Sequence, residues 1–190
     1  MNRAVFLDRD GVINRKARTG EYITRWDDVE FLPGVPEAIV LLRRAGFRVI
    51  VITNQRCVAK GLITIPELES LHGRMVAELG KTGANIDAVY YCPHEKQPTC
   101  RCRKPAPGLL LDAARDHHID LVTSWMIGDS GIDIEAGKNA GCKTARLAYS
   151  GESNNGNPDV IAPSLLSAVR QILQREEVVA GGPVTDVTAN

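Results

Sequence analysis

Four possible metal ligands lie close together near the middle of the chain. Cys92, His94, Cys100 and Cys102 form the pattern C-x-H-x5-C-x-C, in a sequence with five cysteines. Three thiolates and one imidazole form a donor set that is typical of tetrahedral zinc, and four protein ligands leave no position open for a substrate or for water. The pattern therefore predicts a structural zinc ion held by a loop. The alternative is a loop with free thiols.

Carboxylates follow two apolar runs of the sequence. Asp8 and Asp10 stand two residues apart after the run AVFL, and Asp129 follows the run WMIG. Oxygen ligands of this kind favour a hard cation such as Mg²⁺, and one carboxylate can also attack phosphorus and form an aspartyl-phosphate. For the first pair, the alternative is a solvated turn. Asp133 lies one turn further on, where helix capping is the alternative role.

Groups that could bind a phosphate lie at matching positions. Thr53 offers a hydroxyl, Asn54 and Gln55 offer amides, and Lys104 supplies a cation. Phosphoryl transfer requires mainly positioning and the neutralisation of charge, so these residue types fit a phosphoryl-transfer site. Arg103, next to Lys104, has a planar fork suited to a phosphate or a pair of hydroxyls. Its alternative role is a solvated loop charge.

The elements that must position these residues alternate along the chain. Apolar, β-branched runs predict strands, and runs with helical spacing predict helices between them. This alternation predicts an α/β fold, a Rossmann-like parallel sheet with helices on both faces. Ligands bind such sheets beyond the carboxyl ends of the strands, which is where the residues above lie. The predicted strands are Ala4–Asp8, Phe47–Asn54, Ile86–Cys92, Ser124–Asp129 and Lys143–Tyr149, and the predicted helices are Val35–Gly46, Thr64–Gly80, Pro107–His118, Gly131–Gly141 and Ser164–Glu177.

The length and composition fit one domain. With 190 residues, of which 44% are hydrophobic, the chain can bury one substantial core. We expect a single domain over residues 1–177 and a disordered tail over residues 178–190, whose sequence VVAGGPVTDVTAN has no periodicity. The remaining cysteines and histidines are expected to be packed or solvated, namely Cys57, Cys142, His72, His117 and His118.

The charge balance argues against several partners. The 23 basic and 23 acidic residues give a net charge of zero, so we expect no nucleic-acid partner and no membrane partner. No apolar run is long enough to cross a bilayer, and the start MNRAVFLDRDG lacks the pattern of a signal peptide. With an odd number of cysteines, these features predict a cytoplasmic protein. We expect a monomer that acts on a small molecule.

Four segments, in order, resemble the motifs of the haloacid dehalogenase superfamily of phosphatases. They are FLDRDGVIN, VITN, the lysine of RKP, and IGDSGID, and the resemblance covers roughly residues 4–150. It implies that the chain is a phosphoric monoester hydrolase. It also implies that Asp8 is the nucleophile and that Asp10 protonates the leaving alcohol and then activates water. The other implied roles are phosphoryl binding by Thr53 and Lys104, and magnesium binding by Asp8, the carbonyl of Asp10 and Asp129, with Asp133 supporting the ligands from behind.

Within the superfamily, DRDGVIN with TNQ, the C-x-H and C-x-C loop, and CRKP resembles one branch. That branch contains the D-glycero-D-manno-heptose 1,7-bisphosphate 7-phosphatases and the histidinol-phosphatase domain. No insertion in the sequence is long enough for a separate cap domain. The resemblance implies magnesium-dependent hydrolysis of the C7 phosphate, in lipopolysaccharide-core or nucleotide-heptose synthesis. Histidinol-phosphate phosphatase and a non-catalytic sugar-phosphate-binding module are the alternatives. The implied substrate contacts are Arg103, Asn54, Gln55, Ser130, Gly20 and Tyr22.

Overall fold

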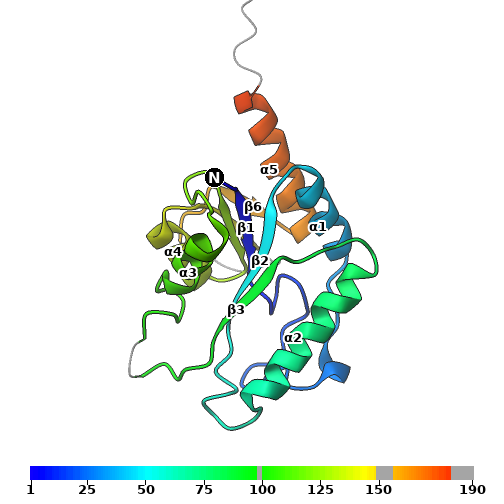
Figure 1. Cartoon of the computed structure of the whole chain (residues 1–190), viewed down its shortest axis with the longest axis vertical. Coiled ribbons are helices and arrows are strands. Elements are labelled where there is room, and N and C mark those ends of the chain that lie inside the picture. Colours follow the sequence, from blue (N-terminus) through cyan, green and yellow to red (C-terminus); the bar gives the residue numbers. More distant parts are fainter. Residues whose placement is uncertain (98–99, 149–155, 181–190) are drawn as a thin grey trace, which may run out of the picture.

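A parallel sheet organises the molecule. We describe a computed structural model over residues 1–97, 100–148 and 156–180. Its six strands are all parallel, in the order β3-β2-β1-β4-β5-β6. The order confirms the predicted Rossmann-like α/β fold, with the first strand of the chain near the middle of the sheet (Figure 1). The strands are β1 (Ala4–Leu7), β2 (Arg48–Asn54), β3 (Ala88–Cys92), β4 (Trp125–Gly128), β5 (Lys143–Leu147) and β6 (Val160–Ala162).

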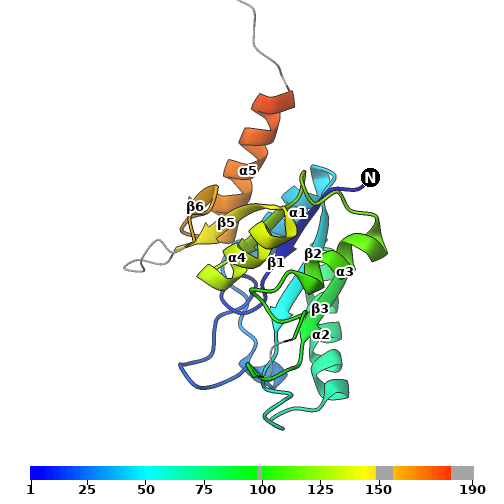
Figure 2. The same cartoon turned by 90° about the vertical axis from the view of Figure 1, so that its left-hand side faces the viewer.

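Helices cover both faces of the sheet. α1, α2 and α5 pack on one face and α3 and α4 on the other, so the domain has three layers (Figures 1 and 2). None of the helices in the described ranges combines the length and the apolar character that a membrane-spanning helix requires. The helices are α1 (Val35–Arg44), α2 (Ile65–Gly80), α3 (Gly108–His117), α4 (Gly131–Ala140) and α5 (Leu165–Ala180), and a short 3-10 helix, η1, spans Trp26–Asp28.

β1 is buried on both faces because its side chains alternate between the two cores. Val5 and Leu7 belong to the core beneath α1 and α5, whereas Ala4 and Phe6 belong to the core beneath α3 and α4. All four side chains are inaccessible to solvent. A strand enclosed in this way reads as a continuous apolar run, as the sequence AVFL does. Asp8, the residue that follows β1, is therefore attached to a strand that the two cores hold in place.

Most predicted elements differ from the structure by one or two residues at their ends, but one strand was missed and the last helix is longer than predicted. β6 was not predicted, since its three residues follow a polar loop and give no clear periodic signal. α5 runs to Ala180, three residues beyond the predicted domain end at residue 177. The rest of the predicted tail, residues 181–190, lies outside the described residues.

Two of the connections at the carboxyl edge of the sheet carry residues of interest. The first follows β1 and reaches α1 with only the short helix η1 in it, and the second joins β3 to α3 and carries the cysteine cluster. In Figure 1 the chain enters β1 at the top, and both connections lie below the sheet. Neither of them forms a separate domain in the described parts of the chain, as expected for a phosphatase without a large cap.

Candidate active site

A buried lysine connects two carboxylates at the carboxyl edge of the sheet. Nζ of Lys104 lies 2.9 Å from Oδ1 of Asp8 and 2.7 Å from Oδ1 of Asp133. It also donates a hydrogen bond to the carbonyl of Ile52 at 2.8 Å, and the residue is only 2% exposed. Because its three N–H groups each have a partner, the ammonium is fixed beside Asp8. The structure thus places a permanent cation next to the predicted nucleophile.

The buried environment shifts the pKa values of both Asp8 and Lys104. Burial raises the pKa of Asp8 to about 7, although Lys104 opposes the rise. Burial disfavours the charge of Lys104, but Asp133 and Asp8 together raise its pKa above the usual value. One ammonium is thus shared between two carboxylates in a poorly solvated place. A further cation close to Asp8 would stabilise its ionised form, the form that can attack phosphorus.

Asn54 holds the backbone of Lys104. Its Oδ1 accepts a hydrogen bond from the Lys104 N–H at 3.1 Å, and its Nδ2 donates to the Lys104 carbonyl at 3.1 Å. This reciprocal pair joins the end of β2 to the loop that leaves the cysteine cluster. Asn54 therefore positions the lysine in the structure, and its predicted contact with substrate stays a prediction.

The carboxylate of Asp10 accepts four hydrogen bonds. Arg9 donates from Nε to Oδ1 at 3.1 Å and from Nη2 to Oδ2 at 2.9 Å. Asn14 donates to Oδ1 at 2.9 Å and Gln55 donates to Oδ2 at 3.1 Å. Each oxygen therefore has two donors. A proton can enter this carboxyl group only where one donor turns away.

Gln55 links the predicted acid to the predicted phosphate-binding hydroxyl. Its Nε2 donates to Oγ1 of Thr53 at 2.9 Å as well as to Asp10. The side chain is buried, at 2% exposure. Gln55 thus orients both groups from beneath, and a contact of its own with substrate stays a prediction.

Arg9 and His72 take part in the site, although neither was predicted to do so. Arg9 is buried and its Nη1 lies 3.0 Å from Nε2 of His72 on α2. The sequence offered one signal for Arg9, a basic residue between two acidic ones in DRD. His72 offered none, because its partner lies 63 positions away in the chain.

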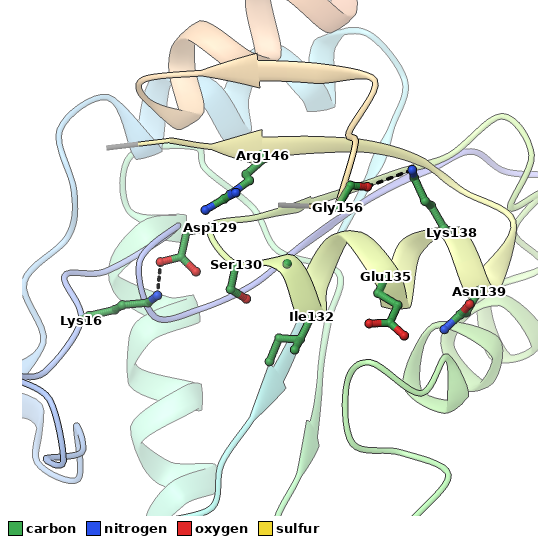
Figure 3. A pocket seen from close by; sticks show the side chains of 10 residues that line it. Lys16, Asp129, Ser130, Ile132, Glu135, Lys138, Asn139, Arg146 and Gly156 are labelled. Atoms are coloured by element: carbon green, nitrogen blue, oxygen red, sulfur yellow. Dashed lines mark hydrogen bonds and ion pairs between the residues drawn. The ribbon is translucent and has the colours of Figure 1, made fainter. Parts of the chain in front are cut away.

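Three carboxylates form a site that a hard cation fits. Ligand oxygens of Asp8, Asp129 and Asp133 all lie within 4.8 Å of one another. Oδ1 of Asp129 is buried and has no hydrogen-bond partner, while Oδ2 is paired with the ammonium of Lys16 (Figure 3). An unpartnered buried carboxylate oxygen is a position that a cation would satisfy. The Asp10 carbonyl as a ligand stays a prediction.

Both carboxylate oxygens of Asp133 already have partners. Its Oδ2 accepts hydrogen bonds from the N–H of Ser130 at 3.1 Å and from the Ser130 hydroxyl, and its Oδ1 pairs with Lys104. Both oxygens are therefore already used, which fits the predicted supporting role better than direct ligation. The same bonds cap α4 at Ser130, so capping and support of the site are combined in one residue.

The cysteine cluster has the spacing of a closed metal site. Sγ of Cys102 lies 3.3 Å from Sγ of Cys92 and 3.4 Å from Sγ of Cys100, and Nδ1 of His94 lies 3.1 Å from Sγ of Cys102. With a Zn–S bond of about 2.3 Å, tetrahedral geometry places neighbouring sulfurs about 3.7 Å apart. The four donors thus fit around one zinc ion with little adjustment.

The remaining predicted residues lie in different surroundings. Arg103 lines a hollow of about 410 Å³ together with Lys104, and its Nη1 donates to the carbonyl of His94 at 3.1 Å. Tyr22 packs instead in a small apolar cluster with Cys57 and residues of the β2–α2 connection. Gly20 is exposed in the first connection. Contacts of Tyr22 and Gly20 with substrate stay predictions.

Comparisons with known proteins identify relatives over most of the chain. A model of the HAD-hydrolase-like family matches residues 101–168. A Rhodopseudomonas palustris protein named D-glycero-beta-D-manno-heptose-1,7-bisphosphate 7-phosphatase is 42% identical over 145 residues, covering 73% of this chain and 79% of the relative. The Escherichia coli K12 enzyme of the same name is 35% identical, with 90% and 92% covered. A Mycobacterium bovis relative, 37% identical with 85% and 86% covered, is named for the alpha anomer.

The comparison with solved structures identifies a relative of the same kind. The D,D-heptose 1,7-bisphosphate phosphatase from B. bronchiseptica, in complex with magnesium and phosphate, superposes with a TM-score of 0.82. It is 32% identical, and the match covers 91% of this chain and 99% of that one. That protein binds magnesium and phosphate on a fold that this chain shares over nearly its whole described length.

Proposed function

This chain belongs to the haloacid dehalogenase-like phosphatases, and from that premise we propose that it hydrolyses the C7 phosphate ester of D-glycero-D-manno-heptose 1,7-bisphosphate. The histidinol-phosphate alternative is not favoured, because the relatives compared above are heptose bisphosphate phosphatases. Magnesium is the cofactor that the bound structural relative supports.

The side chains at the sheet edge supply the parts of such a reaction. A carboxylate oxygen of Asp8 attacks phosphorus, the P–O bond to C7 breaks, and Asp10 gives a proton to the departing alkoxide. Asp10 then takes a proton from water, whose oxygen attacks phosphorus and releases Asp8 and inorganic phosphate. Thr53 and Lys104 bind the phosphoryl oxygens in both steps, and Lys104 gives up one of its protein partners to do so. Magnesium, held by Asp8 and Asp129, would neutralise charge on the phosphoryl group.

One observation carries the proposal: the ammonium of Lys104 is fixed between the carboxylates of Asp8 and Asp133. A lysine that served only to form a stabilising ion pair would need a single carboxylate as its partner. Here a second carboxylate and a third, Asp129, lie within 4.8 Å, and one buried oxygen of Asp129 has no partner. Excess negative charge in a buried site destabilises the fold unless a bound cation neutralises it. This arrangement therefore supports a cation-dependent site for a phosphate.

The hollow beside Lys104 suits the part of the substrate that stays behind. It measures about 410 Å³ and is lined by Arg103, Lys96 and Ile132 among others. Two basic side chains and an apolar wall fit a sugar that carries a second phosphate. We assign the C1 phosphate to Arg103, whose planar guanidinium can bind it with two parallel hydrogen bonds.

We also propose that zinc fixes the loop that delivers Lys104. The cluster of Cys92, His94, Cys100 and Cys102 ends two residues before the lysine. With the reciprocal bonds of Asn54, zinc would restrain the loop on both sides of Lys104. None of the five cysteines forms a disulfide, which fits action in the reducing cytoplasm, and we expect a monomer.

A substrate panel with one matched variant tests the function. The wild-type protein with magnesium should release phosphate from a heptose 1,7-bisphosphate far faster than from histidinol phosphate, and both anomers belong in the panel. Asp8→Asn should fold normally and lose essentially all turnover, and acid-quenched wild-type protein should carry a phosphoryl group on Asp8. Preference for histidinol phosphate would refute the substrate, and substantial turnover by Asp8→Asn would refute the nucleophile.

A further inference from the structure

Lys16 is the basic residue paired with Asp129. Its ammonium contacts Oδ2 of this carboxylate, and Figure 3 shows the side chain reaching across to it from the first connection. The two partners differ sharply in burial, because the side chain of Asp129 is 3% exposed and that of Lys16 is 52% exposed. An exposed side chain thus places its charged end against a buried acid. None of the steps proposed above uses this lysine.

Gly11 leaves the space through which Lys16 passes. A Cβ added at Gly11 would lie 2.0 Å from Oδ2 of Asp129 and 2.8 Å from Cε of Lys16. Both distances are shorter than a van der Waals contact, so any side chain at this position would displace the pair. The backbone φ of +90° at Gly11 also favours glycine. The turn after β1 is therefore shaped around the Lys16–Asp129 contact.

The charge balance explains what Lys16 does there. Lys104 is already shared between Asp8 and Asp133, which leaves Asp129 to a different cation. Burial disfavours the charge of Lys16, but the hydrogen bond and charge of Asp129 raise its pKa above the usual value. A buried carboxylate without a counter-ion is strongly destabilising. In the metal-free protein Lys16 supplies that counter-ion.

We propose that Lys16 is the resident counter-ion of Asp129 and that its ammonium competes with a divalent cation for the negative charge of this carboxylate. This inference rests on the proposed function, because it takes Asp8 and Asp129 as the magnesium ligands. Two cations then compete for Asp129, and the lysine has the lower charge. Lys16 stabilises the metal-free protein and weakens its affinity for magnesium, so the two effects have opposite signs.

Lys16→Met, with Lys138→Met as the matched control, tests the competition. Lys138 lines the same pocket of about 890 Å³, but its Nζ donates to the carbonyls of Gly156 and Asn157 at 2.9 and 2.6 Å. The control removes the same charge from the same pocket without removing a partner of Asp129. The melting temperature without metal and the magnesium dissociation constant from calorimetry are measured for both variants and the wild type.

We expect Lys16→Met to melt several degrees lower than the wild type without metal, and to bind magnesium at least about fivefold more tightly, the lower end of ordinary coupling between sites. Lys138→Met should match the wild type in magnesium affinity. Equal magnesium affinity in all three proteins, or weaker affinity in Lys16→Met, overturns the inference. So does a metal-free Lys16→Met that melts no lower than Lys138→Met.

Failure of the proposed function gives a different result. Asp129→Asn should remove magnesium binding if the proposed site is right, whatever Lys16 does. Unchanged magnesium binding by Asp129→Asn refutes the magnesium site. The change in metal-free melting temperature that Lys16→Met causes involves neither magnesium nor turnover, so it tests the role of Lys16 independently of catalysis.

Discussion

Nη1 of Arg9 lies 3.0 Å from Nε2 of His72, and the two residues are 1% and 4% exposed. Because arginine has only donors, Nε2 of His72 accepts this hydrogen bond and the ring is neutral. Arg9 in turn gives two hydrogen bonds to Asp10. Helix α2 therefore orients the proposed general acid through one buried guanidinium.

We expect His72→Leu to lower kcat about tenfold or more with little change in KM, since a misoriented acid loses part of a contribution of about 100-fold or greater. Stability should fall as well, because a buried donor of Arg9 left without an acceptor costs about 1–3 kcal/mol. His72→Gln keeps an acceptor and should recover most of both losses. Steady-state kinetics and urea unfolding of the two variants check this, and equal defects in both would argue against a role in orientation.

Stability should decrease as pH falls below about 6.5, in part because of His72. Burial and then Arg9 lower the pKa of His72 from 6.5 to about 3 in the folded protein. Between these values the unfolded chain binds a proton that the folded protein does not, so lowering the pH favours unfolding. In His72→Gln this contribution is absent. Urea unfolding at pH 7.0 and 4.5 should show a smaller loss in the variant, and equal losses would contradict the assignment.

The neighbours Lys104 and Arg103 should affect different kinetic constants. Lys104→Ala should lower kcat by about 100-fold or more for every substrate, because it removes a charge that stabilises the transition state. Arg103→Ala should raise KM about tenfold for a heptose bisphosphate, consistent with about 1.5–3 kcal/mol for a charged hydrogen bond. An aryl monophosphate should be hydrolysed normally by Arg103→Ala. An equal effect on both substrates would show that Arg103 does not bind the second phosphate.

Protein purified without added metal should contain about one zinc ion per chain, as a closed four-ligand site implies. Removal of zinc should lower both the melting temperature and kcat, because the loop that carries Lys104 loses its restraint. Cys102→Ser should lose zinc. Cys142→Ala, which alters a buried thiol in the core beneath α3 and α4, should keep it. Elemental analysis decides the point, and zinc-free wild-type protein with full activity would refute the structural role.

The sequence predicted those residues of the site that strands position. Asp8, Thr53 and Asp129 each follow or end a parallel strand, and the carboxyl ends of such strands meet at one edge of the sheet. The roles of Arg9, His72 and Lys16 could not be predicted in the same way. Their partners are set by how α2 and the first connection pack, and hydrophobic periodicity carries no information about pairs that meet only in the tertiary structure.

β1 lies between β2 and β4 with no solvent-accessible side chain, and the amide of Asp8 donates to the carbonyl of Ile127 at 3.0 Å. Amides enclosed in this way exchange with deuterium only when the whole domain unfolds. We therefore expect the amide of Asp8, the proposed nucleophile, to exchange only when the whole domain unfolds. The exposed segment of residues 15–20 has few such bonds and should exchange within seconds to minutes. The part of the site that the sheet carries should therefore open only with the whole domain. The connection that carries Lys16 should open locally and far more often.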